Sequence, residues 1–557
     1  MQVVTVEQMR SIEQAADSQG LTYATMMENA GRAVAAWLEG LGISGQHIVV
    51  LVGPGNNGGD GLVAAYYLHQ AGAHVAVYCW KRDVTNDENW KRVESAGILT
   101  IWSEQDERYT RLKRLVAEAD WIVDALLGTG VSKPITGSLQ EILGVVSKSI
   151  AKRRGDKKVE SFVRVLPATS QLRVDSKPQV LALDVPSGLN CDTGAVDPAT
   201  LPADVTVTLA FPKVGLFLFP GAIMSGQLVV ADIGIPAELA KGITLRVSTP
   251  DWIRTFLPRR PLDAHKGTFG KVMVVGGSVN YSGAPCLAAS AAMRVGAGLV
   301  TLGIAEMLHP ILAAKVSEAT FLLLPHQLGA LVPEAVKVLE KSLTGYDALL
   351  LGPGLGRDEQ TIEFVARLLD LPLGERRARL GFLGATSVEG ESRLTLPPVV
   401  IDADGLNALA TLKGWAQHLP PSAVLTPHPG EMARLLNTAV AEVNAHRIEL
   451  ARQAAKEWGV VVLLKGAYTV IASPEGSTYI NPFATPALAT AGTGDVLAGA
   501  VAGFLAQGLN PFEAAVVGAY VHGLAGQMVS AEIGPAGAVA SDLLSKLPLS
   551  LKSLAGR

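Results

Sequence analysis

Three apolar stretches in the N-terminal half of the sequence end in polar residues whose side chains can do chemistry. Asn57 follows HIVVLV (residues 47–52) within the segment GPGNNGGDG, and Asp124 lies in WIVDALLGTG. Asp184 and Ser187 follow a further apolar run in VLALDVPSGLN. Oxygen ligands without histidine or cysteine suit a hard cation rather than zinc, and a carboxylate can also transfer protons. Each residue taken alone is equally typical of a turn or a helix cap, so a site is indicated only if they converge.

A turn rich in glycine and threonine precedes a long apolar segment in ATAGTGDVLAGAVAGFLAQGL, near the C-terminus. The N–H groups of such a turn and of the helix after it can bind a phosphate. Asp495 would begin that helix, where it is either a base towards a hydroxyl that attacks a phosphoryl group or simply a cap. Lys465, in VVVLLKGAYTV, is a second candidate for a phosphate contact. His428, in LTPHPGEMARLL, is a ligand, a base or a packed polar residue, and its surroundings do not match a zinc-site spacing.

Apolar runs that alternate with helical patterns predict the elements that position these residues. A helical stretch at 6–38 precedes strands at HIVVLV, AHVAVYCW, ADWIVDAL, QVLALDV and DVTVTLAF, with a helix near 62–71. The pattern restarts after Pro236 with KVMVVGG, LVTLGIA, YDALLLG, PVVIDAD, AVLTPH and VVVLLKG, the last followed by a return strand. This alternation is typical of doubly wound α/β domains. In such sheets the carboxyl ends of the strands share one edge, where ligands bind.

The length of 557 residues exceeds what one hydrophobic core fills, so we expect two domains. The first is placed at residues 1–237 and the second at 250–557, with a linker at 238–249. Two charged, weakly patterned insertions are expected, one at 148–177 with the basic run KRRGDKK and one at 374–396. We interpret both as loops or partly disordered excursions.

Composition and charge argue against several classes of partner. The net charge of −4 is too small to indicate a nucleic acid or an acidic membrane surface, and KRRGDKK is more typical of a solvated loop. The three cysteines, Cys79, Cys191 and Cys286, are far apart and fit a reduced, cytoplasmic setting. The N-terminal residues lack the pattern of a signal peptide. Residues 491–509 are apolar, but Asp495 and the many glycines and alanines favour a packed core helix over a membrane span.

The segments MMENAGRAVA, GPGNNGGDGLVAA, DALLGTGV and LALDVPSGLN, in this order, closely resemble the YjeF N-terminal family, the NAD(P)H-hydrate epimerases. The resemblance covers residues 1–237 apart from 148–177 and implies a Rossmann-like three-layer sandwich. It also implies that Asp184 is the acid/base group at the hydrated nicotinamide ring, and that Asn57, Asp124 and Ser187 hold a potassium ion. The residues implied to bind the hydrated cofactor, NAD(P)HX, are Asn56, Asn57, Gly58, Gly59, Asp60, Gly128, Thr129, Gly130, Val131, Ser132, Lys133, Pro134 and Asp184.

The segments HKGTFGKVMVVGGS, LLLGPGLG, PVVIDADGLN, LTPHPGEMARLL and ATAGTGD resemble the YjeF C-terminal family, the ADP- or ATP-dependent NAD(P)H-hydrate dehydratases, over residues 250–555. The resemblance implies a ribokinase-like fold and Mg²⁺ bound with the nucleotide. Asp495 would act on the hydrate, which Ala284, Gly356 and His428 would also contact. Fused forms are typical of bacteria and archaea, so ADP is expected rather than ATP. The residues implied to line ADP are Lys465, Gly466, Ala467, Tyr468, Thr469, Thr485, Thr490, Ala491, Gly492, Thr493 and Gly494.

Together the two resemblances imply an isomerase fused to a lyase that repairs hydrated NAD(P)H. The R and S epimers would interconvert, and the S epimer would be dehydrated with release of AMP and phosphate. A stereospecific dehydratase alone would leave one C6 epimer unused, which explains why the two activities belong together. The expected partners are NADHX, NADPHX and ADP, without nucleic acid or membrane, in a homo-oligomer.

Two alternatives remain open at this point. One is a ribokinase-like vitamin kinase fused to a ligand-binding domain, since fold alone does not decide function. The HKGTFG and HPGEMAR segments argue against it. The other is an N-terminal domain that only senses a ligand or binds a partner, against which the Asn57, Asp124 and Asp184 set argues.

Overall fold

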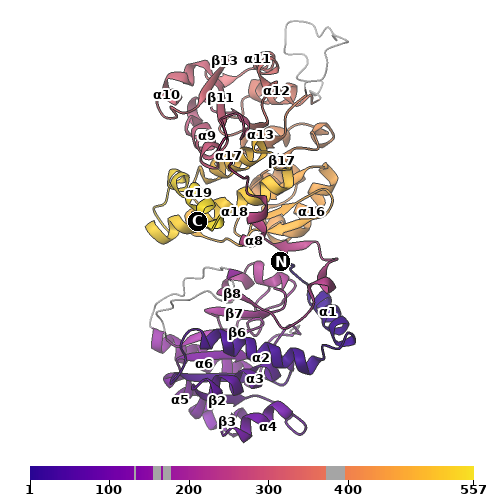
Figure 1. Ribbon diagram of the computed structural model, residues 1–557, viewed down its shortest axis with the longest axis vertical. Coiled ribbons are helices and arrows are strands. Elements are labelled where there is room, and N and C mark those ends of the chain that lie inside the picture. The colour runs from indigo at the N-terminus through magenta and orange to yellow at the C-terminus, as the bar shows by residue number, and fades with distance from the viewer. Residues whose placement is uncertain (131–132, 155–164, 167–176, 372–394, 557) are drawn as a thin grey trace. The chain divides into compact units, whose positions relative to one another are not determined.

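The computed structural model describes residues 1–130, 133–154, 165–166, 177–371 and 395–556. These residues form two compact units, Met1–Arg246 and Val247–Arg557 (Figure 1). The division falls within the segment where we expected a linker. That segment is not a plain connecting loop, because it includes most of the 3-10 helix η4 (Ala237–Ala240) and all of strand β9 (Leu245–Val247).

The first unit is built on a parallel sheet with the strand order β3-β2-β1-β4-β6-β7-β8-β5. The order runs outward from β1 on one side and from β4 on the other. The crevice beside such a switch point is where open α/β sheets bind ligands. The strands are β1 (His47–Val52), β2 (His74–Cys79), β3 (Leu99–Trp102), β4 (Trp121–Ala125), β5 (Val165–Leu166), β6 (Gln179–Leu183), β7 (Val205–Leu209) and β8 (Gln227–Ala231).

Helices cover both faces of this sheet because successive strand residues point to opposite sides. Ile48 and Val50 of β1 pack in one core with side chains of α1, α2 and α3. Val49 and Leu51 pack in a second core with α5 and α6. This arrangement confirms the three-layer α/β class. The helices are α1 (Val6–Ser18), α2 (Tyr23–Glu39), α3 (Asn56–Gln70), α4 (Glu88–Ser95), α5 (Thr110–Glu118), α6 (Ser138–Arg154) and α7 (Gly221–Met224).

Helix α3 begins earlier than the sequence pattern predicted. It starts at Asn56, so that most of the glycine-rich segment is helix rather than turn. The glycines allow the close approach of this helix to its neighbours. A Cβ on Gly58 would lie 2.1 Å from the carbonyl oxygen of Gly53, and one on Gly61 would lie 2.6 Å from the Cβ of Ala125. Dense packing therefore requires glycine at these positions.

The expectation of a loop at 148–177 is partly wrong, because residues 148–154 complete helix α6. Arg154 forms a buried ion pair with Asp204 and donates to the carbonyl oxygen of Pro178. Arg153 donates to backbone carbonyl oxygens at the end of α5. Two of the basic side chains of KRRGDKK are thus held inside the unit. Residues 155–164 and 167–176 lie outside the described residues.

The second unit contains a longer sheet, with the strand order β12-β11-β10-β15-β16-β17-β18-β19-β20. Neighbouring strands from β12 to β18 are parallel, whereas β19 pairs antiparallel with β18 and with β20. These strands are β10 (Lys271–Val275), β11 (Leu299–Ala305), β12 (Thr320–Leu324), β15 (Ala348–Leu351), β16 (Val399–Ile401), β17 (Val424–Leu425), β18 (Val461–Leu464), β19 (Val470–Ala472) and β20 (Thr478–Ile480). β13 (His326–Gln327) and β14 (Ala330–Leu331) form a separate antiparallel pair. The expected insertion at 374–396 lies almost wholly outside the described residues.

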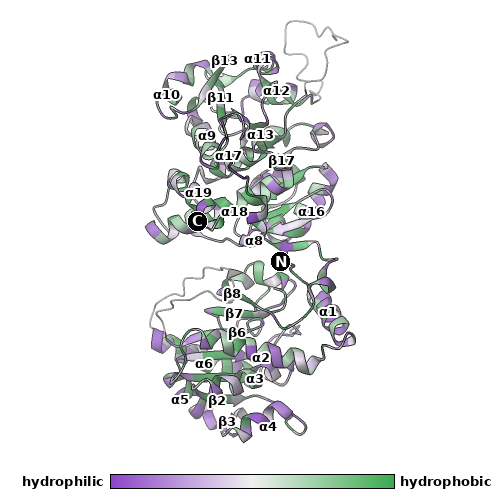
Figure 2. Cartoon of the chain, in the orientation of Figure 1, coloured by the Kyte–Doolittle hydropathy of each residue, from purple (hydrophilic) through white to green (hydrophobic). Residues whose placement is uncertain are grey.

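The apolar segment near the C-terminus is a core helix, as expected. Every residue of α17 from Val496 to Ala506 is buried, and Figure 2 shows hydrophobic residues along α17 and the strands. A Cβ on Gly499 would lie 2.0 Å from the carbonyl oxygen of Ala288 in α9. None of the described helices is both long and apolar enough to cross a membrane. The helices of this unit are α8 (Pro250–Phe256), α9 (Gly283–Arg294), α10 (His309–Ala313), α11 (Ala335–Leu343), α12 (Glu359–Leu368), α13 (Asp404–Leu409), α14 (Pro429–Leu436), α15 (Val440–Ala445), α16 (Arg447–Trp458), α17 (Thr493–Ala506), α18 (Pro511–Ile533) and α19 (Ala540–Leu554).

Candidate active sites

A cavity of about 980 Å³ lies at the edge of the first sheet where β1, β4 and β6 end. The residues expected to bind substrate that line it are Asn56, Asn57, Asp60, Gly128, Thr129, Gly130, Lys133, Pro134 and Asp184. Gly58 and Gly59 do not line it, since they face Arg82 and Met27 instead. Val131 and Ser132 lie outside the described residues. Lining residues that we had not singled out include Arg10, Glu13, Tyr23, Trp80 and Thr136.

The three residues expected to hold potassium lie together around Leu127. The Ser187 hydroxyl donates to Asp124 Oδ1 at 2.6 Å, and the Ser187 amide donates to Asp124 Oδ2 at 2.9 Å. Leu127 joins them to the third residue, because its amide donates to Ser187 Oγ and its carbonyl oxygen accepts from Asn57 Nδ2, both at 2.9 Å. The ends of β4 and β6 and the start of α3 are therefore linked at one point.

The chemistry of this cluster fits a cation with a single charge. The buried Oδ1 atom of Asn57 has no hydrogen-bond partner among the described residues. Asp124 is fully buried, and no lysine or arginine of the described residues pairs with it. Burial raises the pKa of Asp124, which is the expected cost of a carboxylate without a countercharge. The described residues contain no group of three or more His, Cys, Asp or Glu placed to hold a metal, so any ion here relies also on amide, hydroxyl and carbonyl oxygens.

Asp184 has an unusual backbone conformation, and its side chain pairs with a lysine that was not predicted from the sequence. Its φ of +64° lies in the left-handed region, which non-glycine residues rarely adopt. Its Oδ1 accepts from Lys213 Nζ, from Thr208 Oγ1 at 3.2 Å and from the Leu209 amide at 3.0 Å. Lys213 is only 1% exposed. Its one sequence signal is a lysine among apolar residues in FPKVGLF, directly after an expected strand.

The second unit also brings its candidate residues together at the edge where parallel strands end. The neighbouring parallel strands β10, β15, β16, β17 and β18 end at one edge of the sheet. Ala284, at the start of α9, lies 3.1 Å from where a Cβ on Gly354 would be. In the same turn the Gly356 amide donates to Asp404 Oδ2 at 3.0 Å. Two of the residues expected at the hydrate thus lie at or beside one turn after β15.

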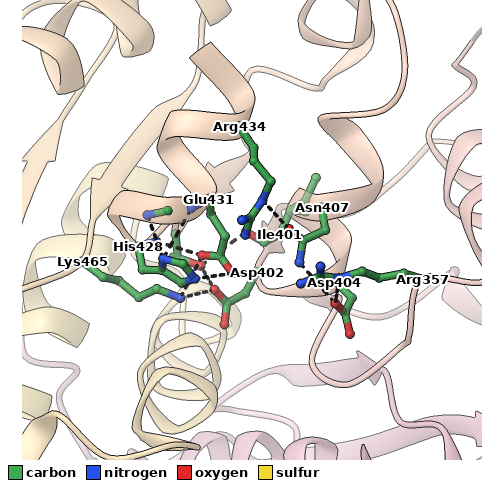
Figure 3. A network of polar contacts seen from close by, with 11 residues as sticks. Arg357, Ile401, Asp402, Asp404, Asn407, His428, Glu431, Arg434 and Lys465 are labelled. Carbon is green, nitrogen blue, oxygen red and sulfur yellow. Dashed lines mark hydrogen bonds and ion pairs between the residues drawn. The ribbon is translucent and has the colours of Figure 1, made fainter. Parts of the chain in front are cut away.

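His428 precedes α14 and acts as its cap. Its Nδ1 accepts from the Gly430 amide at 3.0 Å, and its own amide donates to Glu431 Oε2 at 2.8 Å. Burial, together with the positive charges of Lys465 and Arg434, lowers the pKa of His428. The structure therefore favours a neutral imidazole, half exposed at the edge of the network (Figure 3).

Lys465 reaches from one side into a network that includes the carboxylates of Asp402 and Glu431 (Figure 3). Its Nζ is 2.6 Å from Asp402 Oδ1 and 3.7 Å from Glu431 Oε2, and Asp402 Oδ1 also accepts from the Thr426 hydroxyl at 2.8 Å. Burial alone would lower the pKa of Lys465, but the negative charges of Asp402 and Glu431 outweigh it and raise this pKa. The sequence analysis did not single out these two carboxylates, although PVVIDAD and HPGEMAR contain them.

Asp495 lies in the first turn of α17, where a helix N-terminus favours negative charge. Burial and the negative charge of Asp402 nevertheless raise the pKa of Asp495 to about 7. The preceding turn is close to Lys465, because a Cβ on Gly494 would lie 3.4 Å from Lys465 Nζ. The two parts of the expected nucleotide site, after β18 and before α17, therefore meet. A carboxyl group that titrates near neutrality is suited to proton transfer.

Several other residues of the expected nucleotide site shape its turns. The hydroxyl of Thr469 donates to the Gly466 carbonyl at 2.8 Å, and the hydroxyl of Thr493 donates to the Thr490 carbonyl at 2.9 Å. Tyr468 is almost fully buried. His522, which the sequence analysis missed, is also buried, and its Nε2 lies 2.9 Å from the Thr493 carbonyl oxygen. These contacts hold the Gly492–Gly494 turn in place.

The same turns involve the remaining expected nucleotide residues. Thr490 donates to the Ala538 carbonyl oxygen, and Thr485 accepts from the Ala487 amide. Gly466, Ala467 and Ala491 are exposed. The turn after β18 and the turn before α17 therefore expose backbone groups and small side chains at their surface.

Comparisons with known proteins agree with this division of the chain. The model of the family described as YjeF-related protein N-terminus matches residues 23–215, and that described as NAD(P)H-hydrate dehydratase matches 272–549. A crystal structure of an ADP/ATP-dependent NAD(P)H-hydrate dehydratase from Bacillus subtilis, co-crystallized with ATP/Mg²⁺, is 30% identical, with a TM-score of 0.45. It covers 56% of this chain and 98% of that chain.

Two relatives span both units. The bifunctional NAD(P)H-hydrate repair enzyme Nnr of Moorella thermoacetica is 39% identical, covering 100% of this chain and 97% of that protein. The protein of the same name from Thermofilum pendens is 35% identical over 100% of this chain and 97% of its own length. Because this identity extends over both units and almost the whole of each relative, the chain belongs to the family of bifunctional NAD(P)H-hydrate repair enzymes.

Proposed function

We propose that this chain repairs hydrated NAD(P)H, with the first unit as the epimerase and the second as an ADP-dependent dehydratase. One observation carries the proposal: each unit has its own carboxyl group at the carboxyl edge of its own sheet. Asp184 lies in a cavity large enough for part of a dinucleotide, and Asp495 lies beside a lysine and a helix N-terminus. The substrates are the R and S forms of NADHX and NADPHX, and ADP.

In the epimerase unit, Asp184 transfers protons at C6 of the hydrated nicotinamide ring. Its hydrogen bonds from Lys213, Thr208 and Leu209 fix the position of the carboxylate beside the cavity. Asn57, Asp124 and Ser187 would hold a potassium ion that neutralises the buried carboxylate and fixes three chain segments. The other cavity residues, from Asn56 to Pro134, orient the dinucleotide.

In the dehydratase unit, the turn before α17 and Lys465 receive the phosphates of ADP. Asp495 takes the proton of the C6 hydroxyl as this oxygen attacks the β-phosphorus, and AMP leaves. The C6–O bond then breaks, and a proton leaves C5 for the departing phosphate, which restores the C5=C6 double bond of the dihydronicotinamide. Mg²⁺ bound with the nucleotide neutralises phosphate charge, and Asp402 and Glu431 offer buried carboxylate oxygens of the kind it requires. Ala284, Gly356 and His428 hold the hydrate.

A vitamin kinase would share the phosphoryl-transfer step but would release a phosphorylated product. Family membership over the full chain disfavours that alternative, and it disfavours a first unit that only senses a ligand.

The test is to incubate the purified chain with a mixture of NADPHX epimers, with and without ADP. We expect the absorbance of the reduced cofactor to return fully only with ADP. Without ADP, chromatography should show that a sample enriched in one epimer returns to the equilibrium mixture. Formation of a stable phosphorylated product, or dehydration of one epimer only, would contradict the proposal.

A further inference from the structure

A second carboxyl group, that of Asp60 in α3, faces the cavity of the first unit, and the reaction described above assigns it no proton transfer. Asp60 is 8% exposed and lines the same cavity as Asp184. No hydrogen bond or ion pair joins its carboxyl group to another described residue. The carboxyl group of Asp60 therefore opens onto the cavity, where a substrate can reach it.

The surroundings of the two carboxyl groups differ in the feature that controls ionisation. Asp184 accepts three hydrogen bonds, one of them from the ammonium group of Lys213. Asp60 accepts no hydrogen bond from the residues that the structure describes. Burial first, and then the negative charges of Asp184 and Glu13, raise the pKa of Asp60 well above its usual value, although Arg82 and Lys213 oppose this shift. Two carboxyl groups in one cavity with such contrasting environments are suited to separate roles as acid and base.

We propose that Asp60 is the catalytic acid of epimerisation and that Asp184 is its base; this assignment rests on the function proposed above. The Asp60 carboxyl gives its proton to the C6 hydroxyl group. The C6–O bond breaks as the lone pair of N1 forms a C6=N1 double bond, and water leaves. A water molecule then adds to C6 from the other face, and its proton passes to the Asp184 carboxylate.

Water and protons balance over these two steps without a further reactant. One water molecule leaves and one enters, and one proton moves from Asp60 to Asp184. Exchange with cavity water returns the proton to Asp60 after each turnover. Two groups are needed because the leaving hydroxyl and the entering water are on opposite faces of the ring. The two carboxyl groups come from different elements, α3 and the turn after β6, and both line the cavity.

The first experiment compares Asp60→Asn with Glu13→Gln, which changes the third acidic residue lining the cavity besides Asp60 and Asp184. Asn has the size of Asp but has no acidic proton to give, so Asp60→Asn should lower kcat for epimerisation by about 10²–10⁴-fold with a small change in KM. Dehydration of the S epimer by the same preparation should be unchanged. A large loss in Glu13→Gln together with normal epimerisation in Asp60→Asn would overturn the assignment.

The pH profile provides a readout that a structural role of Asp60 would not change. A catalytic acid works only when protonated, so the wild-type rate should fall as the pH rises through the pKa of Asp60. The residual rate of Asp60→Asn should lack this alkaline decline. If the decline persists in the variant, another group is the acid.

Infrared difference spectroscopy tests the protonation state without any substrate. The spectrum of wild type minus Asp60→Asn at neutral pH should contain the carbonyl stretch of a protonated carboxyl group. Its absence would show that Asp60 is ionised and would overturn the proposal. If the wild-type chain fails to interconvert the epimers at all, the function proposed for the first unit is wrong, and the infrared result still decides the protonation of Asp60.

Discussion

In both units the candidate carboxyl groups lie at the carboxyl ends of parallel strands or beside them. Asp184 and Asp495 nevertheless have different charged neighbours. In the first unit, Asp184 accepts three hydrogen bonds, and a buried lysine pairs with it directly. In the second, Lys465 pairs with Asp402 and approaches Glu431, while Asp495 beside them has a pKa raised to about 7. The comparison teaches that the neighbours of a carboxyl group, rather than its place at a strand end, determine its charge and its chemical role.

The largest expected effect tests whether the two edges are independent. Asp495→Asn should lower dehydration by about 10³-fold, the range expected for loss of a general base. Epimerisation should be unchanged, because the two units have separate cores. Cofactor absorbance measures the first activity and chromatography the second. Normal dehydration by this variant would show that Asp495 is only a helix cap.

Removing the carboxylate from the cluster of Asn57, Asp124 and Ser187 in the first unit should have an effect on epimerisation almost as large. Asp124→Ala removes the one carboxylate among the three expected potassium ligands, so we expect epimerisation to be lost while dehydration of the S epimer persists. If Asp124 only capped a turn, alanine would cost about 1 kcal/mol of stability and little activity. A crystal structure grown in potassium, paired with the kinetics of the variant, is the deciding measurement. A site without an ion and a near-normal rate would refute the prediction.

Lys213→Met isolates the buried ion pair that distinguishes Asp184 from Asp495. Leaving a buried carboxylate without its partner should lower the free energy of unfolding by about 3–5 kcal/mol. The double variant Lys213→Met/Asp184→Asn should recover much of this loss, because no charge is then left unpaired. Urea unfolding of the wild type and the variants provides the comparison. Equal stability of the single and double variants would mean that the pair contributes little.

The pH dependence of dehydration should differ from that of epimerisation. Asp495 must be ionised to accept a proton, and its pKa is raised to about 7. The rate should therefore increase about tenfold per pH unit below that value and level off above it. Epimerisation, which depends on other carboxyl groups, should not follow this curve. A dehydration rate that is flat between mildly acidic and neutral pH would contradict the assignment of Asp495 as the base.

The smallest expected effect concerns the nucleotide. ADP should support dehydration better than ATP, as expected for a fused enzyme of this family. Rates with the two nucleotides at equal concentration and with Mg²⁺ answer the question. A clear preference for ATP would rule the expectation out without affecting the epimerase predictions.

Most of the sheet could be predicted because its central strands are continuous apolar runs. HIVVLV and LVTLGIA correspond to β1 and β11 over their full lengths. The strands that were not predicted are mostly short or lie near the margins of the sheets, namely β3, β5, β8, β9, β12, β13, β14 and β20. Only one of the residues of β12 is fully buried, so its sequence lacks the signal of a core strand. The start of α3 was missed because glycines usually mark turns, whereas here they permit close packing.

Local patterns in the sequence determined where Asp184, Asp495 and the cation cluster belong, because strand ends and helix starts depend on neighbouring residues. Tertiary structure alone decided how these groups are charged. Lys213 is 29 residues from Asp184 and meets it only because β6 and β7 are adjacent in the sheet. The exposure of Asp60 and the charges around Asp495 likewise depend on segments distant in the chain. Ionisation reflects burial and all nearby charges in three dimensions, and for that reason it could not be predicted from the sequence motifs.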